Sequence, residues 1–155
     1  MAVRTPSLIL LLVVFPNAGF ACKCPPIPDV ERLDNAKAVF HMVVLETRLV
    51  DTERRHIEVK YRVIEDFKMA ASVSTIRDMY TSCSLQFQPG EEWIVFVPRQ
   101  EIRGLDNVVD QCSGSFRAAW PGGEGEFWQR TNDRTDALRA AAARASGIDV
   151  PGASK

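Results

Sequence analysis

The chain has 155 residues and is nearly neutral, with 19 basic and 20 acidic side chains. A length of this order favours a single domain, and the lack of a basic excess argues against nucleic acid as a partner. The sequence contains no phosphate-binding glycine loop, no Gly-x-Ser-x-Gly segment and no His-Glu-x-x-His segment. It therefore predicts neither an enzyme nor a bound cofactor.

The first 21 residues are typical of a secretory signal peptide. One charge, at Arg4, precedes an apolar run over residues 8–15, and small residues stand at Gly19 and Ala21. The run is too short to span a bilayer, so no membrane span is expected. We expect cleavage after Ala21, so that the protein is secreted into an extracellular or periplasmic compartment with Cys22 as its first residue. Because lipoprotein signals are also cleaved before a cysteine, lipidation of Cys22 is an open alternative.

Four cysteines, Cys22, Cys24, Cys83 and Cys112, lie in the part expected to be exported. An even number in an oxidising compartment indicates two disulfides. A bridge between Cys22 and Cys24 would close a very short, strained ring, so the two long-range pairings stay open. Of these we expect Cys22 with Cys83 and Cys24 with Cys112. A structural zinc site is disfavoured, because its ligands usually include Cys-x2–4-Cys pairs.

The chain then predicts an extended segment, a short helix and two strands. Prolines in the segment 25–28 restrict the backbone to extended conformations, and Asp29 can cap a helix over residues 30–37. The apolar run over residues 38–45 is rich in β-branched side chains and predicts a buried strand. Strict alternation over residues 56–64 predicts a second strand with one apolar face.

Further along the chain, three more strands and a second helix are expected. The strands cover residues 73–80, 93–97 and 108–109. Five strands in a chain of this length indicate a mainly β fold built as a small closed barrel. Residues 120–125 read as a loop, and Asn132 or Asp133 can cap a helix that ends at Gly147 and has a mostly alanine apolar face.

Side chains that could carry acid–base chemistry are few. His41 lies inside an apolar strand and His56 opens an alternating one, so both are expected to be structural. Glu91 and Glu92 follow the turn signal Pro89-Gly90 and are expected to lie in a solvated turn.

Several of these features occur together in one known family. The segment Cys22-Lys23-Cys24-Pro25-Pro26, the short helix, Ala38-Val39-Phe40, the alternating strand, Cys83, Pro89-Gly90-Glu91-Glu92-Trp93 and Cys112-Ser113 together resemble the netrin-like domain of the tissue inhibitors of metalloproteinases. The resemblance covers residues 22–115. It implies a five-stranded barrel of the oligonucleotide/oligosaccharide-binding type (OB-fold) over residues 22–118. Residues 119–155 would then form a C-terminal loop and helix extension.

The resemblance also implies a function and a set of contact residues. In that family the first cysteine presents its amino nitrogen and carbonyl oxygen to the catalytic zinc of a protease, so Cys22 would face the zinc. Lys23 would point toward the protease's primary specificity pocket. The neighbouring subsites would take Cys24, Pro25 and Pro26, and a second edge would be formed by Thr81, Ser82, Cys83 and Ser84. We therefore expect a secreted metalloprotease inhibitor; the alternative is a netrin-like protein-binding module without inhibitory activity.

Overall fold

The computed structural model describes residues 22–50, 53–119 and 126–147. The expected signal peptide and the expected loop at 120–125 lie outside these residues. As predicted, the described chain is mainly β and carries two disulfides. Its elements are α1 (Asp29–Asn35), β1 (Ala38–Val50), β2 (His56–Lys68), η1 (Ala70–Ser72), β3 (Ile76–Met79), β4 (Glu92–Val97), β5 (Val108–Val109), η2 (Gln111–Ser113), β6 (Phe116–Ala119) and α2 (Glu126–Ala145).

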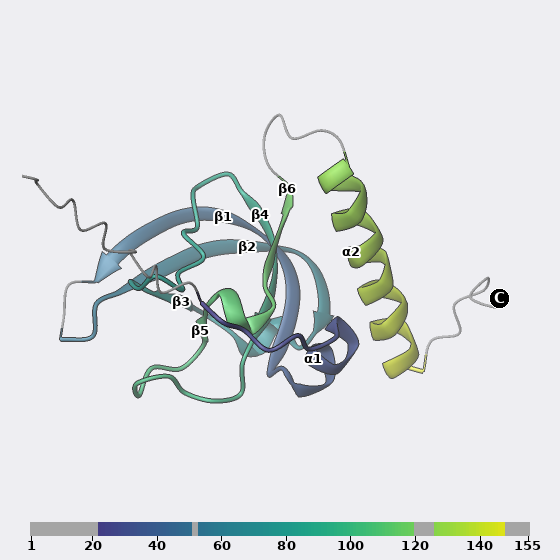
Figure 1. Cartoon of the computed structure of the whole chain (residues 1–155), viewed down its shortest axis with the longest axis horizontal. Coiled ribbons are helices and arrows are strands. Elements are labelled where there is room, and N and C mark those ends of the chain that lie inside the picture. Colours follow the sequence, from purple (N-terminus) through teal and green to yellow (C-terminus); the bar gives the residue numbers. More distant parts are fainter. Residues whose placement is uncertain (1–21, 51–52, 120–125, 148–155) are drawn as a thin grey trace, which may run out of the picture.

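All of the named strands belong to one sheet, in the order β5-β3-β2-β1-β4-β6. Neighbours are antiparallel except β3 and β5, which are parallel. Register shifts interrupt the pairing of the long strands β1 and β2, and the sheet curls around its concave face (Figure 1). Among the described residues the hydrogen-bonded ladder ends at β5 and β6, so this six-stranded sheet is a half-barrel rather than the expected closed, five-stranded barrel.

The strand predictions missed β6 and misjudged several lengths. The sequence of β6 has no clear alternation, and pairing with β4 is what orders it. Strands β1 and β2 continue past the predicted ends at residues 45 and 64, since cross-strand pairs such as Arg48 with Glu58 extend the ladder. Strand β3 begins only at Ile76, because the preceding segment turns through η1.

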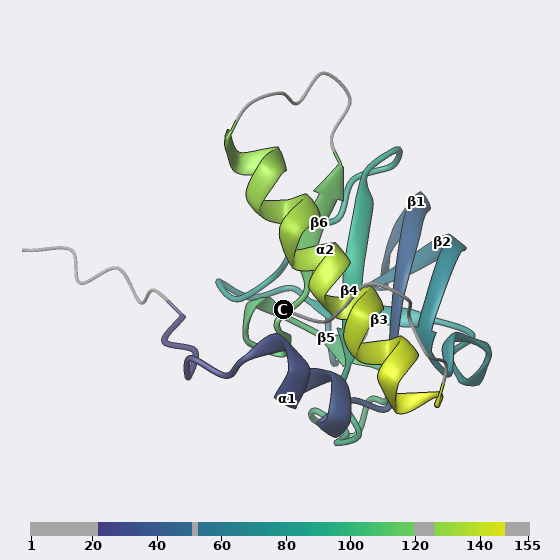
Figure 2. The same ribbon diagram turned by 90° about the vertical axis from the view of Figure 1, so that its right-hand side faces the viewer.

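Apolar side chains pack on both faces of the sheet. The concave face buries a core in which Phe40, Met42 and Val95 are fully enclosed. The convex face is covered by α1 and α2 (Figure 2). There Leu138 of α2 packs in one cluster with Val39 of β1. Because Val39 and Phe40 are consecutive strand residues, they point to opposite faces, and the apolar run of β1 supplies both cores.

Both helices begin earlier than predicted. Helix α2 starts at Glu126, before the expected caps Asn132 and Asp133, which are instead exposed positions within it. Helix α1 starts at Asp29, whose side chain makes no capping hydrogen bond. The carboxylate of Asp29 binds Arg134 of α2 through two contacts, Oδ2 to Nε at 2.5 Å and Oδ1 to Nη2 at 2.7 Å. A side chain expected to start one helix therefore joins the two helices.

The turn before β4 is held by the side chain of Glu91, which points into the protein and not into solvent. Glu91 is buried, with 1% of its surface exposed. Its Oε2 accepts a hydrogen bond of 2.8 Å from the indole Nε1 of Trp93, and its Oε1 lies 2.8 Å from Nη2 of Arg117. Glu92 contacts Nε2 of His41 at 2.9 Å. The prediction of a solvated turn was wrong for Glu91, because a cationic partner and an indole donor satisfy its carboxylate inside the fold.

Candidate functional site

The expected contact residues come together along one edge of the half-barrel. The disulfides Cys22–Cys83 and Cys24–Cys112 have the predicted pairing, with Cα–Cα distances of 5.6 and 4.9 Å. Cys83 lies in the loop after β3, and Cys112 lies in η2, between β5 and β6. We call residues 22–26 the strap, and the strap together with residues 81–84 the disulfide edge. The two bridges fix the strap on both sides of Lys23.

Arg32 of α1 holds the strap through hydrogen bonds to backbone carbonyl groups. Its guanidinium donates to the carbonyl oxygens of Pro25 at 3.2 Å, Ile27 at 3.0 Å and Cys112 at 2.7 Å. A planar guanidinium can serve several acceptors at fixed angles, which an ammonium does less well. Gly114 leaves room for this side chain: its φ is +92°, and a Cβ there would lie 2.4 Å from Cδ of Arg32.

The short helical turn η2, which carries Cys112, is capped by Asp110. The Oδ1 atom of Asp110 accepts hydrogen bonds from the backbone N–H groups of Cys112 at 2.9 Å and Ser113 at 2.8 Å. The backbone N–H of Gln111 donates to the carbonyl oxygen of Cys83 at 3.0 Å. The two loops that receive the disulfides are therefore also bonded directly to each other.

Asp78 of β3 holds the loop that carries Cys83. It is fully buried, and its Oδ2 accepts hydrogen bonds from Oγ of Ser84 at 2.7 Å and from the N–H groups of Leu85 at 3.0 Å and Gln86 at 3.1 Å. Burial raises the pKa of Asp78 to about 6, the charge of Asp110 adds to the rise, and the three hydrogen bonds oppose it. The loop is thus shaped around one interior carboxylate.

The residues of the disulfide edge differ in accessibility. The three cysteines of the edge are half-buried. Ser84 is buried, and its hydroxyl is committed to Asp78, so it supports the loop from within instead of facing solvent. The exposed side chains of the edge are those of Lys23, Pro25, Pro26, Thr81 and Ser82.

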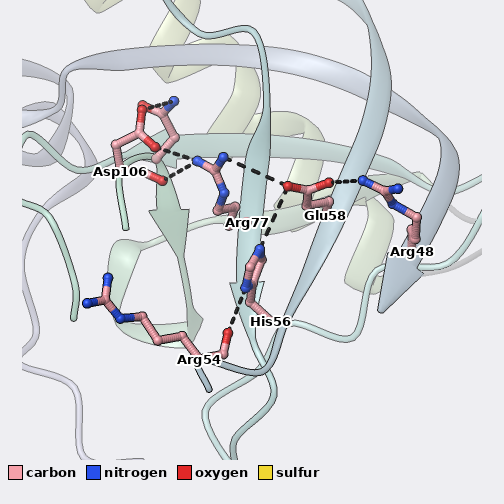
Figure 3. A network of polar contacts seen from close by, with 7 residues as sticks. Arg48, Arg54, His56, Glu58, Arg77 and Asp106 are labelled. Atoms are coloured by element: carbon pink, nitrogen blue, oxygen red, sulfur yellow. Dashed lines mark hydrogen bonds and ion pairs between the residues drawn. The ribbon is translucent and has the colours of Figure 1, made fainter. Parts of the chain in front are cut away.

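A second polar network holds the other face of β3 (Figure 3). Arg77, next to Asp78, binds Asp106, and its Nη2 lies 3.8 Å from Oε1 of Glu58. Glu58 also pairs with Arg48 at 2.5 Å, and this hydrogen bond is the main reason why the pKa of Glu58 is lowered. Strand β3 is therefore anchored on both faces just before the loop that leads to Cys83.

The buried histidine of β2 takes part in the same region. The Nε2 of His56 lies 3.7 Å from Oε1 of Glu58, and its Nδ1 contacts the backbone carbonyl oxygen of Arg54 at 2.7 Å (Figure 3). Arg54 in turn donates to the carbonyl oxygen of Gly104 at 3.2 Å. These contacts connect the end of the β1–β2 hairpin with the loop before β5.

A shallow hollow of about 540 Å³ opens beside the disulfide edge. Thr81 lines it together with Ile57 of β2 and Phe87. Tyr80 also lines it, has an exposed fraction of 60%, and carries the guanidinium of Arg55 at 5.3 Å from its ring centroid. An aromatic ring beside a rigid loop is a frequent feature of protein-binding surfaces.

Sequence reasoning missed the three side chains that support the disulfide edge. Asp78 had a detectable signal, since it is an acidic residue between the apolar residues Ile76 and Met79 in an expected strand. Asp110 stands two residues before Cys112, a spacing suited to a turn cap. Arg32 had no such signal, because its acceptors are backbone groups that only the fold brings near.

The disulfide edge offers no metal site of its own. In the part of the chain that the structure describes, no group of three or more His, Cys, Asp or Glu side chains is placed to hold a metal ion. Within that same part, no helix combines the length and the apolar character needed to cross a membrane. The edge can act chemically as a rigid, exposed ligand for a groove in another molecule.

No protein-family model matches the chain, and a search of curated proteins also finds no match.

Proposed function

We propose that the exported protein, with Cys22 as its first residue, inhibits a zinc metalloendopeptidase. The amino nitrogen and carbonyl oxygen of Cys22 would bind the catalytic zinc of that protease. The observation that best supports this proposal is the double anchoring of the strap. The bridges at Cys22 and Cys24 hold one part, and the guanidinium of Arg32, which we call the Arg32 fork, binds the carbonyl oxygens of Pro25 and of Ile27 just after the strap. A segment already held in one conformation loses little entropy when it enters a groove.

The proposed chemistry follows from the properties of an amino terminus. An α-amino group has a pKa near 8, so it gives up its proton readily to a metal ion. Catalytic zinc keeps one open position for the attacking water, and a nitrogen and an oxygen ligand in that position displace the water. Because the side chain of Cys22 is bonded to Cys83, its backbone cannot rotate away from the edge.

The half-barrel supports assigning residues 22–118 to an OB-fold of the netrin-like type, with residues 119–155 as a C-terminal extension. Strand β1 lies between β2 and β4, and the parallel pair β3 and β5 leads into the two loops that receive the strap. The OB-fold is a partly open Greek-key barrel, which agrees with a strongly curled sheet. The two disulfides agree with secretion, since such bonds persist in oxidising compartments.

The test compares the protein that begins at Cys22 with a version that carries one extra alanine before Cys22. Both are assayed against a panel of zinc endopeptidases that includes apolar and acidic specificity pockets. The extension moves the free amine away from Cys22 without touching the fold, so it should abolish inhibition. Mass spectrometry of both proteins should show the loss of four hydrogens expected for two disulfides. Equal inhibition by both versions, or none by either, would contradict the proposal.

The alternative is a netrin-like protein-binding module without inhibitory activity. It is favoured by the exposed apolar side chains of the β1–β2 hairpin, among them Leu45 and Leu49, with exposed fractions of 47% and 48%. If neither version inhibits any protease, a Leu45→Ser, Leu49→Ser double variant tests this function. It should lose the cross-links that the unmodified chain makes to a purified exported partner, whereas Lys23→Met should keep them.

A further inference from the structure

Lys23 is held in a fixed position with its side chain directed away from the protein. Its two neighbours, Cys22 and Cys24, both point toward the body of the protein, since each forms a disulfide with it. Side chains alternate in direction along an extended segment, so the residue between two inward-pointing cysteines points outward. The side chain of Lys23 is exposed, in agreement with this geometry.

Within the part of the chain that the structure describes, the ammonium group of Lys23 makes no contact that the fold needs. Lys37 donates to Oδ1 of Asn107 at 2.8 Å, and Lys68 donates to the carbonyl oxygens of Leu33 and Asp34 at 2.7 and 2.8 Å. Among the described residues, by contrast, no carboxylate or carbonyl group binds Lys23. The guanidinium of Arg32 is committed to the carbonyl oxygens of Pro25 and Ile27. The charge of Lys23 is therefore available to a partner.

The chemistry of a buried ammonium restricts which pocket can receive it. Moving an unpaired charge from water into an apolar pocket is strongly unfavourable, whereas a pocket that holds a carboxylate compensates the lost hydration. Because the strap is fixed by two bridges and the Arg32 fork, it cannot shift to return the ammonium to solvent once Cys22 reaches the zinc. Specificity then depends on the charge of the pocket.

Building on the proposed function, we propose that the target protease has an acidic primary specificity pocket and cleaves on the amino side of basic residues. The carboxylate of that pocket would pair with the ammonium of Lys23 while the amino group of Cys22 occupies the zinc. Lys23 is then the residue that determines specificity. An apolar residue in its place would redirect the inhibitor to proteases with apolar pockets.

The experiment uses two purified zinc endopeptidases, one that cleaves before lysine and one that cleaves before leucine. Inhibition constants are measured for the chain beginning at Cys22 and for Lys23→Met and Lys23→Arg. The unmodified chain should inhibit the lysine-directed enzyme about 30-fold or more better than Lys23→Met does. Lys23→Arg should retain most of this inhibition, and Lys23→Met should gain inhibition of the leucine-directed enzyme. Since Lys23 is exposed, all three proteins should fold and form both disulfides.

The outcomes separate this inference from the function on which it rests. If Lys23→Met inhibits the leucine-directed enzyme while no version inhibits the lysine-directed one, the acidic pocket is refuted and the inhibitor function stands. The same holds if the unmodified chain inhibits the leucine-directed enzyme as well as Lys23→Met does. If no version inhibits either enzyme, both the inhibitor function and the acidic pocket are refuted.

Discussion

The disulfide edge and helix α2, which we call the α2 layer, are attached to the same sheet by different kinds of interaction. The strap is held by two covalent bridges and the Arg32 fork, and the loop beside it by the buried carboxylate of Asp78. Helix α2 is held by apolar contacts of Leu138 and Ala141, together with the ion pairs that Arg134 and Arg139 make with Asp29 and Glu65.

Because of this difference, the disulfide edge can bind a partner protein, whereas α2 mainly stabilises the fold. The apolar side chains that attach α2 to the sheet are buried and cannot contact a partner. Leu138, for example, has an exposed fraction of 1%. Anchoring by bridges and carbonyl groups leaves the outer side chains of the strap exposed. We therefore expect changes in α2 to alter stability alone, and changes beneath the strap to alter both stability and binding.

The largest effect is expected from removing the longer bridge. A Cys24→Ala, Cys112→Ala variant opens a loop with a sequence separation of 88, which should lower the free energy of unfolding by about 4 kcal/mol. Urea unfolding followed by far-ultraviolet circular dichroism measures the change. A loss below about 1 kcal/mol would mean that the bridge adds little to an edge already held by Arg32.

The next effect lies in the α2 layer. Leu138→Ala should lower the free energy of unfolding by about 3 kcal/mol, because it leaves a cavity between α2 and the sheet. Leu49→Ala is the matched control: Leu49 is 48% exposed, so its removal should cost less than about 1 kcal/mol. Protease inhibition should be unchanged in Leu138→Ala at temperatures where it is folded. A loss of inhibition there would contradict the division between the two regions.

Asp78 should make stability depend on pH. Its pKa is raised from 3.8 to about 6, so the native state binds the proton more tightly than the unfolded chain does. The stabilisation from this group is complete below pH 3.8 and is lost as the pH rises through about 6. The proton can occupy Oδ1, which has no partner, while Oδ2 keeps its three donors.

Asp78→Asn removes this titration while preserving shape. Between pH 4 and pH 8 the difference in unfolding free energy between the unmodified chain and the variant should change by about 2 to 3 kcal/mol, in favour of the unmodified chain at low pH. Urea midpoints measured at several pH values give the comparison. Parallel curves for the two proteins would show that Asp78 does not control the pH dependence.

The smallest effect is expected at Arg32. Arg32→Lys keeps the charge but loses the planar fork, which should lower the free energy of unfolding by about 1 to 2 kcal/mol. Amide hydrogen exchange should become faster in the strap and η2 and stay unchanged in α2. The matched control is Arg139→Lys, whose pair with Glu65 is exposed, and which should cost less than about 0.5 kcal/mol. If amide hydrogen exchange in the strap were unchanged in Arg32→Lys, Arg32 would not anchor the strap.

Hydrophobic alternation and cysteine spacing, which can be read from a short stretch of sequence, predicted individual strands and the disulfide pairing. The alternation after His56 identified β2, and the strain of a Cys22–Cys24 ring directed the cysteines toward long-range partners. The order of the strands and the half-open sheet depend on long-range pairing, which no window of the sequence contains. Strand β6 is the clearest case, because its four residues become a strand only through β4.

The supporting side chains of the candidate site were harder to predict for a related reason. Glu91 follows a turn signal and carries a charge, which are both features of solvated loops, yet Trp93 and Arg117 enclose it. Ser84 stands next to a cysteine of the edge but faces Asp78, six residues earlier in the chain. In both residues the direction of the side chain is decided by a polar partner, and hydrophobic periodicity carries no information about such partners.

Gly114 gives the two regions a mechanical connection. The side chain of Arg32, which holds the strap, packs over its Cα, while its carbonyl oxygen accepts a hydrogen bond of 3.3 Å from Arg134 of α2. One glycine is therefore used by both regions. A side chain at residue 114 would displace Arg32, so the absence of a Cβ lets the Arg32 side chain and helix α2 both pack against the same short turn.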